Sequence, residues 1–141
     1  MEQRKIAFRA WDKIKNEMYY KVLVGNTDGN DENYTCNSIL KKDTGEWMNA
    51  DHFCIDLMQF TGKKDCNGKE VYEGDLLNIG ANEFGFITNE KGENVTYEVK
   101  FEGCDYILYR VDLQLNWGRL SRLEEMNWNC QVVGNVHEAL S

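Results

Sequence analysis

The chain has 141 residues, of which 42% are hydrophobic and 28% charged, and this composition is that of a globular protein and excludes a disordered one. Its formal net charge of −8 disfavours a phosphate-rich partner such as nucleic acid, unless the basic residues cluster. They cluster weakly, because residues 1–24 hold six Lys and Arg against three Asp and Glu while the rest is strongly acidic.

The cysteines and the apolar runs bear on the cellular compartment. The five Cys are odd in number and form no C-x-x-C pair, and no secretory signal opens the chain. No apolar run approaches the roughly 18 residues that a membrane span requires. We therefore expect a cytoplasmic protein in a reducing environment, with no membrane partner.

The N-terminal segment predicts a hairpin. Ile6, Phe8 and Ala10 recur with the period of two that marks a strand with one buried face. A polar, turn-like segment follows at Asp12–Glu17, and Met18–Val24 has the pattern of a second strand. We expect residues 1–24 to form two antiparallel strands.

The middle of the chain predicts short strands separated by loops. The polar run Gly25–Asn33 has nothing to bury and indicates a loop. Short strands are expected at Tyr34–Leu40, Asp75–Ile79 and Phe84–Thr88, whereas Phe53–Phe60 fits either a strand or one helical turn.

The C-terminal part carries the clearest pattern. Val95–Phe101 and Ile107–Leu115 both alternate apolar and polar residues, and Glu102–Asp105 supplies a turn between them, which predicts a long antiparallel hairpin. Arg119–Asn127 is the helical candidate, and Gln131–Val136 predicts a closing strand. The whole pattern favours an all-β, mainly antiparallel fold with at most one or two short helices, as a barrel or a sandwich.

The stretch QFTGKKDCNGKEVYEGDLLNI, from Gln59 to Ile79, was tested for ligand chemistry because it combines turn residues with carboxylates. An EF-hand with Gly68 at its sixth place would have Lys63 and Gly74 where the first Asp and the bidentate Glu are needed. No glycine-rich phosphate motif occurs either. We expect no metal and no cofactor.

A structural role explains this stretch better. Asn67-Gly68 is the strongest short hairpin signal, and we expect a type I′ turn in which both residues have positive φ. Gly74, between Glu73 and Asp75, marks a second tight turn. Replacing Gly68 or Gly74 by Ala should cost on the order of 1 kcal/mol if φ is positive there.

Catalysis has weak support in the sequence. His52 and Cys54 would face the same way in a strand, next to Asp51, and a hydrolase that uses His52 and Cys54 is one alternative. The paired carboxylates, such as Glu73 with Asp75, are what a solvated acidic surface gives. We therefore expect no enzymatic activity and assign no catalytic residue.

Three pieces of the sequence together resemble a known family. FRAWDK at Phe8–Lys13, LMQFTG followed by KDCNGKEVYEGD within Leu57–Asp75, and VVGNV at Val132–Val136 are similar to the YopX family of small phage and prophage proteins. The resemblance implies a compact β-rich fold with an SH3-like barrel in its C-terminal part, made inside a bacterial host cell. It brings no catalytic residues and no established activity.

On this resemblance, residues 1–141 form a single YopX-like domain. Residues 1–58 would be an N-terminal β region with a variable loop at 25–52, and residues 59–141 a barrel-like core. The sequence departs from the family pattern at its end, where Val136-His137-Glu138-Ala139 replaces the usual Ile-Tyr-Glu-Asn-Pro, and at Cys66, where a polar residue is common.

The preferred hypothesis for function is a non-enzymatic binding or regulatory module that self-associates, with a host or phage protein as a possible further partner. The alternative is a nucleic-acid-binding barrel that uses the basic N-terminal hairpin. In it, Arg9 and Lys13 would contact phosphates together with Arg4, Lys5 and Lys15, and Trp11 or Tyr19 would stack on bases. Arg9, Trp11, Lys13 and Tyr19 are therefore the candidate partner-binding residues.

Overall fold

The structure is a computed structural model, and it describes residues 5–25, 36–40, 47–49, 55–81 and 85–140. The chain divides into two compact units, Met1–Phe60 and Thr61–Ser141. This division lies close to the border that the sequence suggests between residues 58 and 59.

The N-terminal unit is built from short antiparallel strands. Its elements are β1 (Phe8–Asp12), β2 (Glu17–Tyr19), β3 (Val22–Gly25), β4 (Cys36–Leu40), β5 (Trp47–Asn49) and the first part of β6 (Ile55–Lys64). Strand β1 lies between β2 and β6, so that Trp11 faces Met18 on one side and Asp56 on the other. Strands β3, β4 and β5 form a separate sheet in that order.

The predicted strand Met18–Val24 is two strands in the structure. Strand β2 ends at Tyr19, and β3 begins at Val22 in another sheet. Tyr20 and Lys21 between them are exposed, so the buried alternation stops there. A small core holds Ala10 and Tyr19, with Val22, Ile55 and Leu57 packed against it.

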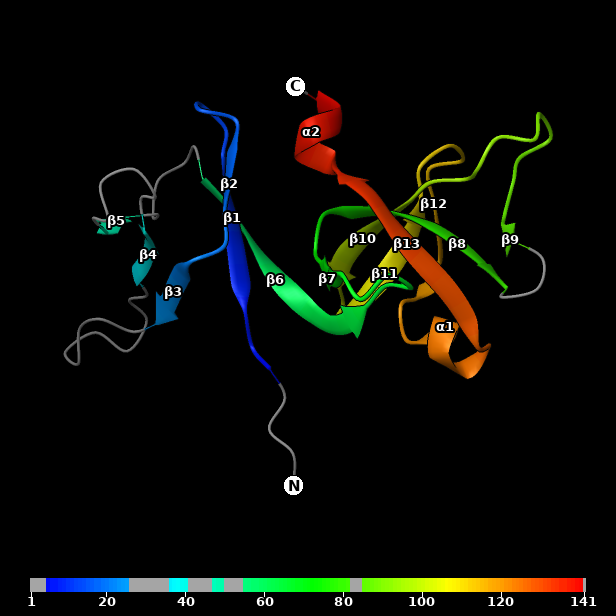
Figure 1. The fold of residues 1–141 in the computed structure, drawn as a ribbon, viewed down its shortest axis with the longest axis horizontal. Helices are drawn as coiled ribbons and strands as arrows, with labels where there is room; N and C mark the ends of the chain where they lie inside the picture. The colour runs from blue at the N-terminus through cyan, green and yellow to red at the C-terminus, as the bar shows by residue number, and fades with distance from the viewer. Residues whose placement is uncertain (1–4, 26–35, 41–46, 50–54, 82–84, 141) are drawn as a thin grey trace. The chain divides into compact units, whose positions relative to one another are not determined.

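The C-terminal unit contains one curled sheet with two short helices (Figure 1). Its elements are β7 (Glu70–Tyr72), β8 (Asp75–Ala81), β9 (Gly85–Phe86), β10 (Tyr97–Glu102), β11 (Asp105–Arg110), β12 (Leu115–Arg119), α1 (Arg122–Glu125), β13 (Trp128–Asn135) and α2 (Val136–Leu140). The strand order is β12-β11-β10-β8-β13, all antiparallel, and β9 also pairs with β8. The prediction of an all-β, mainly antiparallel fold with at most one or two short helices is confirmed, and the barrel expected in the C-terminal part is a curled, half-barrel sheet.

The core of this unit lies on the concave face of the curled sheet. Ten buried side chains form it: Val71, Leu77, Ile79, Val95, Tyr97, Val99, Leu108, Leu120, Leu123 and Cys130. Leu123 comes from α1, so the single helical turn between β12 and β13 is held by the side chain that it buries.

The predicted strand Ile107–Leu115 is wrong in its second half. Strand β11 ends at Arg110, the chain turns through Val111–Gln114, and β12 runs back along β11. Beyond β10 the pairing still reaches Thr96, whose O accepts from Val111 N at 3.1 Å, and only Asn94 and Val95 separate Thr96 from the Asn89–Glu93 turn. Gln114 takes a positive φ of 51° in the reversal.

Candidate interaction surface

The hairpin between β6 and β7 is organised by the carboxylate of Asp65. Its Oδ1 accepts hydrogen bonds from the backbone N–H groups of Asn67 (2.9 Å) and Lys69 (2.8 Å), and Gly68 N donates to Asp65 O at 3.0 Å. Gly68 has a φ of 82°, but Asn67 does not share the positive φ that a type I′ turn requires. The loop is instead a three-residue turn that ends on a left-handed glycine.

The second oxygen of Asp65 reaches a distant strand. Oδ2 accepts from Val132 N of β13 at 2.9 Å, and Cys66 N donates to Cys130 O at 2.8 Å, so the hairpin tip covers the outer edge of β13. Burial raises the pKa of Asp65, but its hydrogen bonds from Val132, Lys69 and Asn67 outweigh burial and lower the pKa overall. The carboxylate therefore stays ionised at neutral pH.

The turn between β7 and β8 is organised by Asp75, the second buried carboxylate of the Gln59–Ile79 stretch. Asp75 is 1% exposed, and its Oδ2 accepts from Tyr72 N at 2.7 Å. Gly74 has a φ of 89°, donates to Val99 O (2.8 Å) and accepts from Val136 N (3.0 Å). Asp65 and Asp75 thus serve as acceptors for backbone N–H groups within the fold.

The structure places three of the four predicted partner-binding residues in the interior. Arg9 is 2% exposed, Trp11 7% and Tyr19 5%, because β1 is covered on both of its faces. Phosphate contact and base stacking need exposed side chains, which these three do not have. Lys13 is exposed and forms an ion pair with Asp56 at 3.1 Å. The strand pattern could not reveal this, since it predicts one solvent-facing side.

The structure describes only some of the residues that were considered for catalysis, phosphate contact or metal binding. His52 and Cys54 lie outside the described residues, as does Arg4. Among the residues that the structure describes, no three His, Cys, Asp or Glu side chains gather in a way that could hold a metal ion. Over the same residues, no helix is long and apolar enough to cross a membrane.

The thiols differ in their surroundings. Cys66 and Cys104 are exposed, whereas Cys130 is buried in the core of the C-terminal unit. Burial raises the pKa of Cys130 to about 11, so it remains a protonated thiol at neutral pH. Cys104 sits at the tip of the β10–β11 hairpin, where both it and Gly103 have positive φ.

Three aromatic rings close the core beside β12. Trp117 stacks on Trp128 with ring centroids 6.0 Å apart and meets Tyr97 edge-on at 5.7 Å. The guanidinium of Arg122 lies 5.2 Å from the centre of the Trp117 ring. Since Trp117 and Trp128 both pack against the buried cluster, these rings belong to the core.

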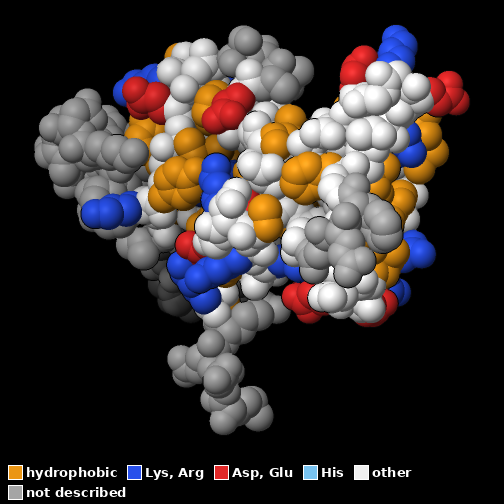
Figure 2. All heavy atoms as spheres, turned by 45° about the vertical axis from the view of Figure 1, so that its right-hand side comes forward, with side chains coloured by type: hydrophobic (Ala, Val, Ile, Leu, Met, Phe, Trp, Pro, Cys, Tyr) orange, Lys and Arg blue, Asp and Glu red, His pale blue; other side chains and the backbone are white. Residues whose placement is uncertain are grey.

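A group of apolar side chains surrounds the start of β12 without entering the core. Val111 is 42% exposed, Leu113 56% and Leu115 44%. We call these three side chains and the outer edge of β12 the β12 surface. Figure 2 shows that apolar side chains do reach the exterior of the molecule, among charged ones. The sequence reading missed this surface, because it assigned these residues to a core strand.

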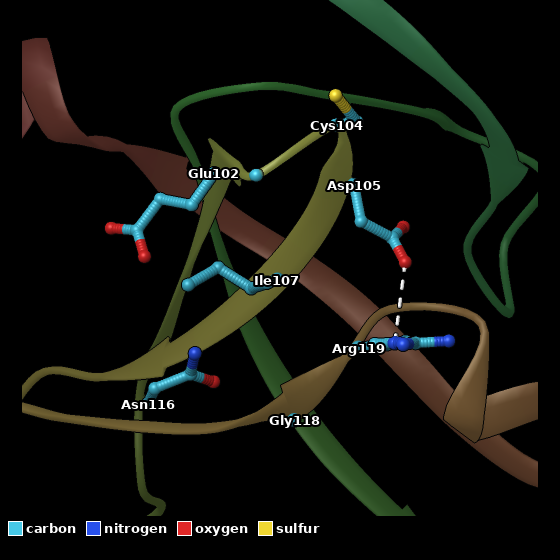
Figure 3. Close-up of a pocket in the computed structure, with 8 residues that line it drawn as sticks. Glu102, Cys104, Asp105, Ile107, Asn116, Gly118 and Arg119 are labelled. Atoms are coloured by element: carbon cyan, nitrogen blue, oxygen red, sulfur yellow. Dashed lines mark ion pairs between the residues drawn. The ribbon is translucent and has the colours of Figure 1, made fainter.

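A shallow hollow of about 340 Å³ borders the same strand. It is lined by Glu102, Gly103, Cys104, Asp105, Ile107, Asn116, Gly118 and Arg119. Figure 3 shows Ile107 and Asn116 on neighbouring strands, and Arg119 pairing with Asp105, at 3.4 Å. Arg119 and Asp105 offset each other's charge in this ion pair, which leaves Glu102 as the remaining charged side chain of the lining.

Comparison with known proteins agrees with this architecture. The family pattern described as YopX protein matches residues 7–139. The chain belongs to the YopX family. No curated protein matches it. The resemblance predicted from FRAWDK, the Leu57–Asp75 stretch and VVGNV is therefore confirmed.

Two crystal structures from this comparison have the same fold. Protein EF1440 from Enterococcus faecalis is 24% identical, with a TM-score of 0.62, and the alignment covers 99% of this chain and 98% of that one. The yopX protein of Bacillus subtilis is 18% identical, with a TM-score of 0.57 and coverages of 94% and 93%. At these identities the likeness establishes the fold of this YopX protein alone.

Proposed function

We propose that this YopX protein is a non-enzymatic binding module of phage or prophage origin that acts by self-association. The observation that carries the proposal is the β12 surface. Three large apolar side chains within five residues, Val111, Leu113 and Leu115, are each more than two-fifths exposed. An exposed apolar cluster next to a sheet edge is typical of a protein interaction surface.

The roles of the buried polar groups support a binding module over an enzyme. Asp65 and Asp75 accept hydrogen bonds from backbone N–H groups that would otherwise be unsatisfied. The buried Cys130 thiol is kept protonated by its high pKa, which is the opposite of what a nucleophile requires. Asp65, Asp75 and Cys130 thus serve the fold.

Light scattering on the full chain, over a range of micromolar concentrations, tests the proposal. We expect a mass of at least two chains that falls toward that of one chain on dilution. A constant single-chain mass across this range would exclude self-association as the mode of action. Ionic strength should change this mass little, since the cluster is apolar and its contribution to binding is not screened by salt.

A further inference from the structure

The two edge strands of the curled sheet differ in what lies beside them. In the strand order β12-β11-β10-β8-β13, the two ends are β12 and β13. The edge of β13 is covered by the hairpin tip, where Asp65 accepts from Val132 and Cys66 donates to Cys130. In the part of the chain that the structure describes, β12 pairs with β11 and with no further strand.

An uncovered edge strand offers backbone N–H and C=O groups to another strand, and proteins usually protect such an edge with charge, proline or a cover. Among the residues that the structure describes, β12 has one charged side chain, Arg119 at its end, and no proline and no further strand beside it. Leu113–Gly118, with the sequence LQLNWG, contains six uncharged residues and no proline. The extended part, β12 itself at Leu115–Arg119, is about 17 Å long at the rise of a strand, which is the usual length of a paired strand.

The charges at its ends favour a second copy of the same chain as the occupant. Asp112 precedes the run and Arg119 follows it, and each is already paired within the chain, Asp112 with Arg110 at 2.7 Å and Arg119 with Asp105 at 3.4 Å. Although the chain carries a net charge of −8, this edge therefore presents no net charge to a copy of itself. In an antiparallel arrangement, the Asp112 end of one strand lies beside the Arg119 end of the other.

The apolar side chains also fit such an arrangement. Leu115 pairs with Arg110 and Arg110 with Tyr97, so the three side chains share one face of the sheet. Trp117 contacts Tyr97 and so lies on that face too. A two-fold axis perpendicular to the sheet keeps this face on the same side in both copies, so Leu115 and Trp117 of the two chains meet.

We propose that two copies of this protein pair antiparallel through β12, joining their curled sheets into one continuous sheet with Leu115 and Trp117 at its centre. This inference rests on the proposed self-association and assigns it to one strand. The register centred on Asn116 places Leu115 of each copy opposite Trp117 of the other. A register centred on Leu115 would bring Leu113, in the turn before β12, opposite Trp117.

The first test compares two lysine substitutions by light scattering on the full chain. Leu115→Lys puts a charge into the proposed interface, and Val133→Lys puts the same charge on the covered strand β13, where Val133 is 49% exposed. We expect Leu115→Lys to weaken dimer formation at least tenfold and Val133→Lys to leave it unchanged. Circular dichroism and thermal unfolding show whether both variants remain folded.

The outcomes separate this inference from the proposed function. A wild-type protein that is strictly monomeric overturns both. A wild-type dimer that survives Leu115→Lys, or that dissociates equally with Val133→Lys, leaves self-association standing and overturns the assignment to β12. A dimer of the wild type and of Val133→Lys, with a monomeric Leu115→Lys, supports the assignment.

A cross-linking experiment tests the pairing without relying on destabilisation. In a background with Cys36, Cys54, Cys66 and Cys104 all replaced by serine, which leaves only the buried Cys130 thiol, Asn116→Cys or Leu115→Cys should form an intermolecular disulfide under mild oxidation. Residues that face their own copies across an antiparallel pair lie about 4.5–5.5 Å apart, within the range of a disulfide. A dimer in which neither position cross-links would overturn the antiparallel pairing. An edge that instead captures an extended peptide from another protein, with no dimer, would do the same.

Discussion

Two hairpin turns of the C-terminal unit have nearly the same local structure and very different surroundings. One begins at Asp65 and the other at Asn89. In each, the side-chain Oδ1 of the first residue accepts from the N–H groups two and four residues later, at 2.8–3.0 Å. The fourth residue is a glycine with positive φ, 82° at Gly68 and 80° at Gly92, whose N–H donates to the first carbonyl at 3.0 Å in both.

The difference lies in the second side-chain atom and in burial. Asp65 is 8% exposed, and its Oδ2 accepts from Val132, 67 positions away in the sequence. The side chain of Asn89 has its hydrogen bonds inside its own turn, which is exposed. Local sequence is therefore sufficient to build this turn, and the additional oxygen of a carboxylate makes it a link between distant parts of the fold.

The largest effect should come from removing the carboxylate. Asp65→Ala leaves three backbone N–H groups without their acceptor, those of Asn67, Lys69 and Val132, and should lower the free energy of unfolding by about 3 kcal/mol. Urea denaturation followed by tryptophan fluorescence measures it. Asn89→Ala, which removes the matching local bonds at the surface, should cost about 1 kcal/mol or less. Equal costs for the two would contradict the role given to Val132.

The long-range bond can be isolated by an isosteric change. Asp65→Asn retains an oxygen for the turn but presents an NH₂ group to Val132 N–H, two donors facing each other. We expect a loss of about 2 kcal/mol, since a hydrogen bond to a charged acceptor is removed. Amide hydrogen exchange at Val132 should also be faster in Asp65→Asn than in the wild type. Unchanged exchange there would show that the edge of β13 is protected by other contacts.

The difference in stability between the wild type and Asp65→Asn should depend on pH. The folded-state pKa of Asp65 is lowered below its unfolded value, so its contribution to stability is fully present above the unfolded pKa, about 3.9. That contribution is lost as the pH falls through the folded-state pKa. The stability difference between the wild type and Asp65→Asn should therefore be constant from pH 7 to about pH 5 and shrink below about pH 4. A difference that stays constant down to pH 2 would contradict it.

The sequence predicts the local turn at Asp65 but not its long-range contact. Asp65 and Gly68 mark a turn by local chemistry, so the sequence predicts one there, although it favours type I′. Nothing local to Asp65 indicates Val132, because that contact depends on how β13 packs. Burial of Arg9 and Trp11 escaped prediction for the same reason, since it depends on what covers the second face of β1.

The β12 surface shows a different limit of sequence reading. Val111, Leu113 and Leu115 alternate with polar residues just as a buried strand does, and periodicity cannot tell an exposed apolar face from a buried one. Counting from the Glu102–Asp105 turn would have helped. Antiparallel pairing there sets Val111 against Thr96, and only Asn94 and Val95 separate Thr96 from the Asn89–Glu93 turn, so little of the neighbouring chain was left to pair with the second half of the predicted strand.

The two glycines should respond alike in spite of their surroundings. An added Cβ at Gly68 or at Gly92 would meet no atom within 4 Å, so the cost of an alanine arises only from the positive φ. We expect Gly68→Ala and Gly92→Ala each to cost about 1 kcal/mol in denaturation experiments. A cost at Gly68 that exceeds the cost at Gly92 several-fold would mean that the hydrogen bonds between the hairpin tip and β13 amplify local strain.

The smallest effect should come from giving the Asn89 turn a carboxylate like that of Asp65. Asn89→Asp retains the acceptor for Lys91 N and Glu93 N, but in the part of the chain that the structure describes its second oxygen has no distant backbone N–H to accept from. The nearby Glu90 and Glu93 carboxylates oppose the added charge, and salt screens that repulsion. We expect a change within about 0.5 kcal/mol, measured beside Asp65→Asn under the same conditions. A substantial stabilisation would mean that the charge of an aspartate strengthens this turn by itself, and the effect of Asp65 would then need no contribution from β13.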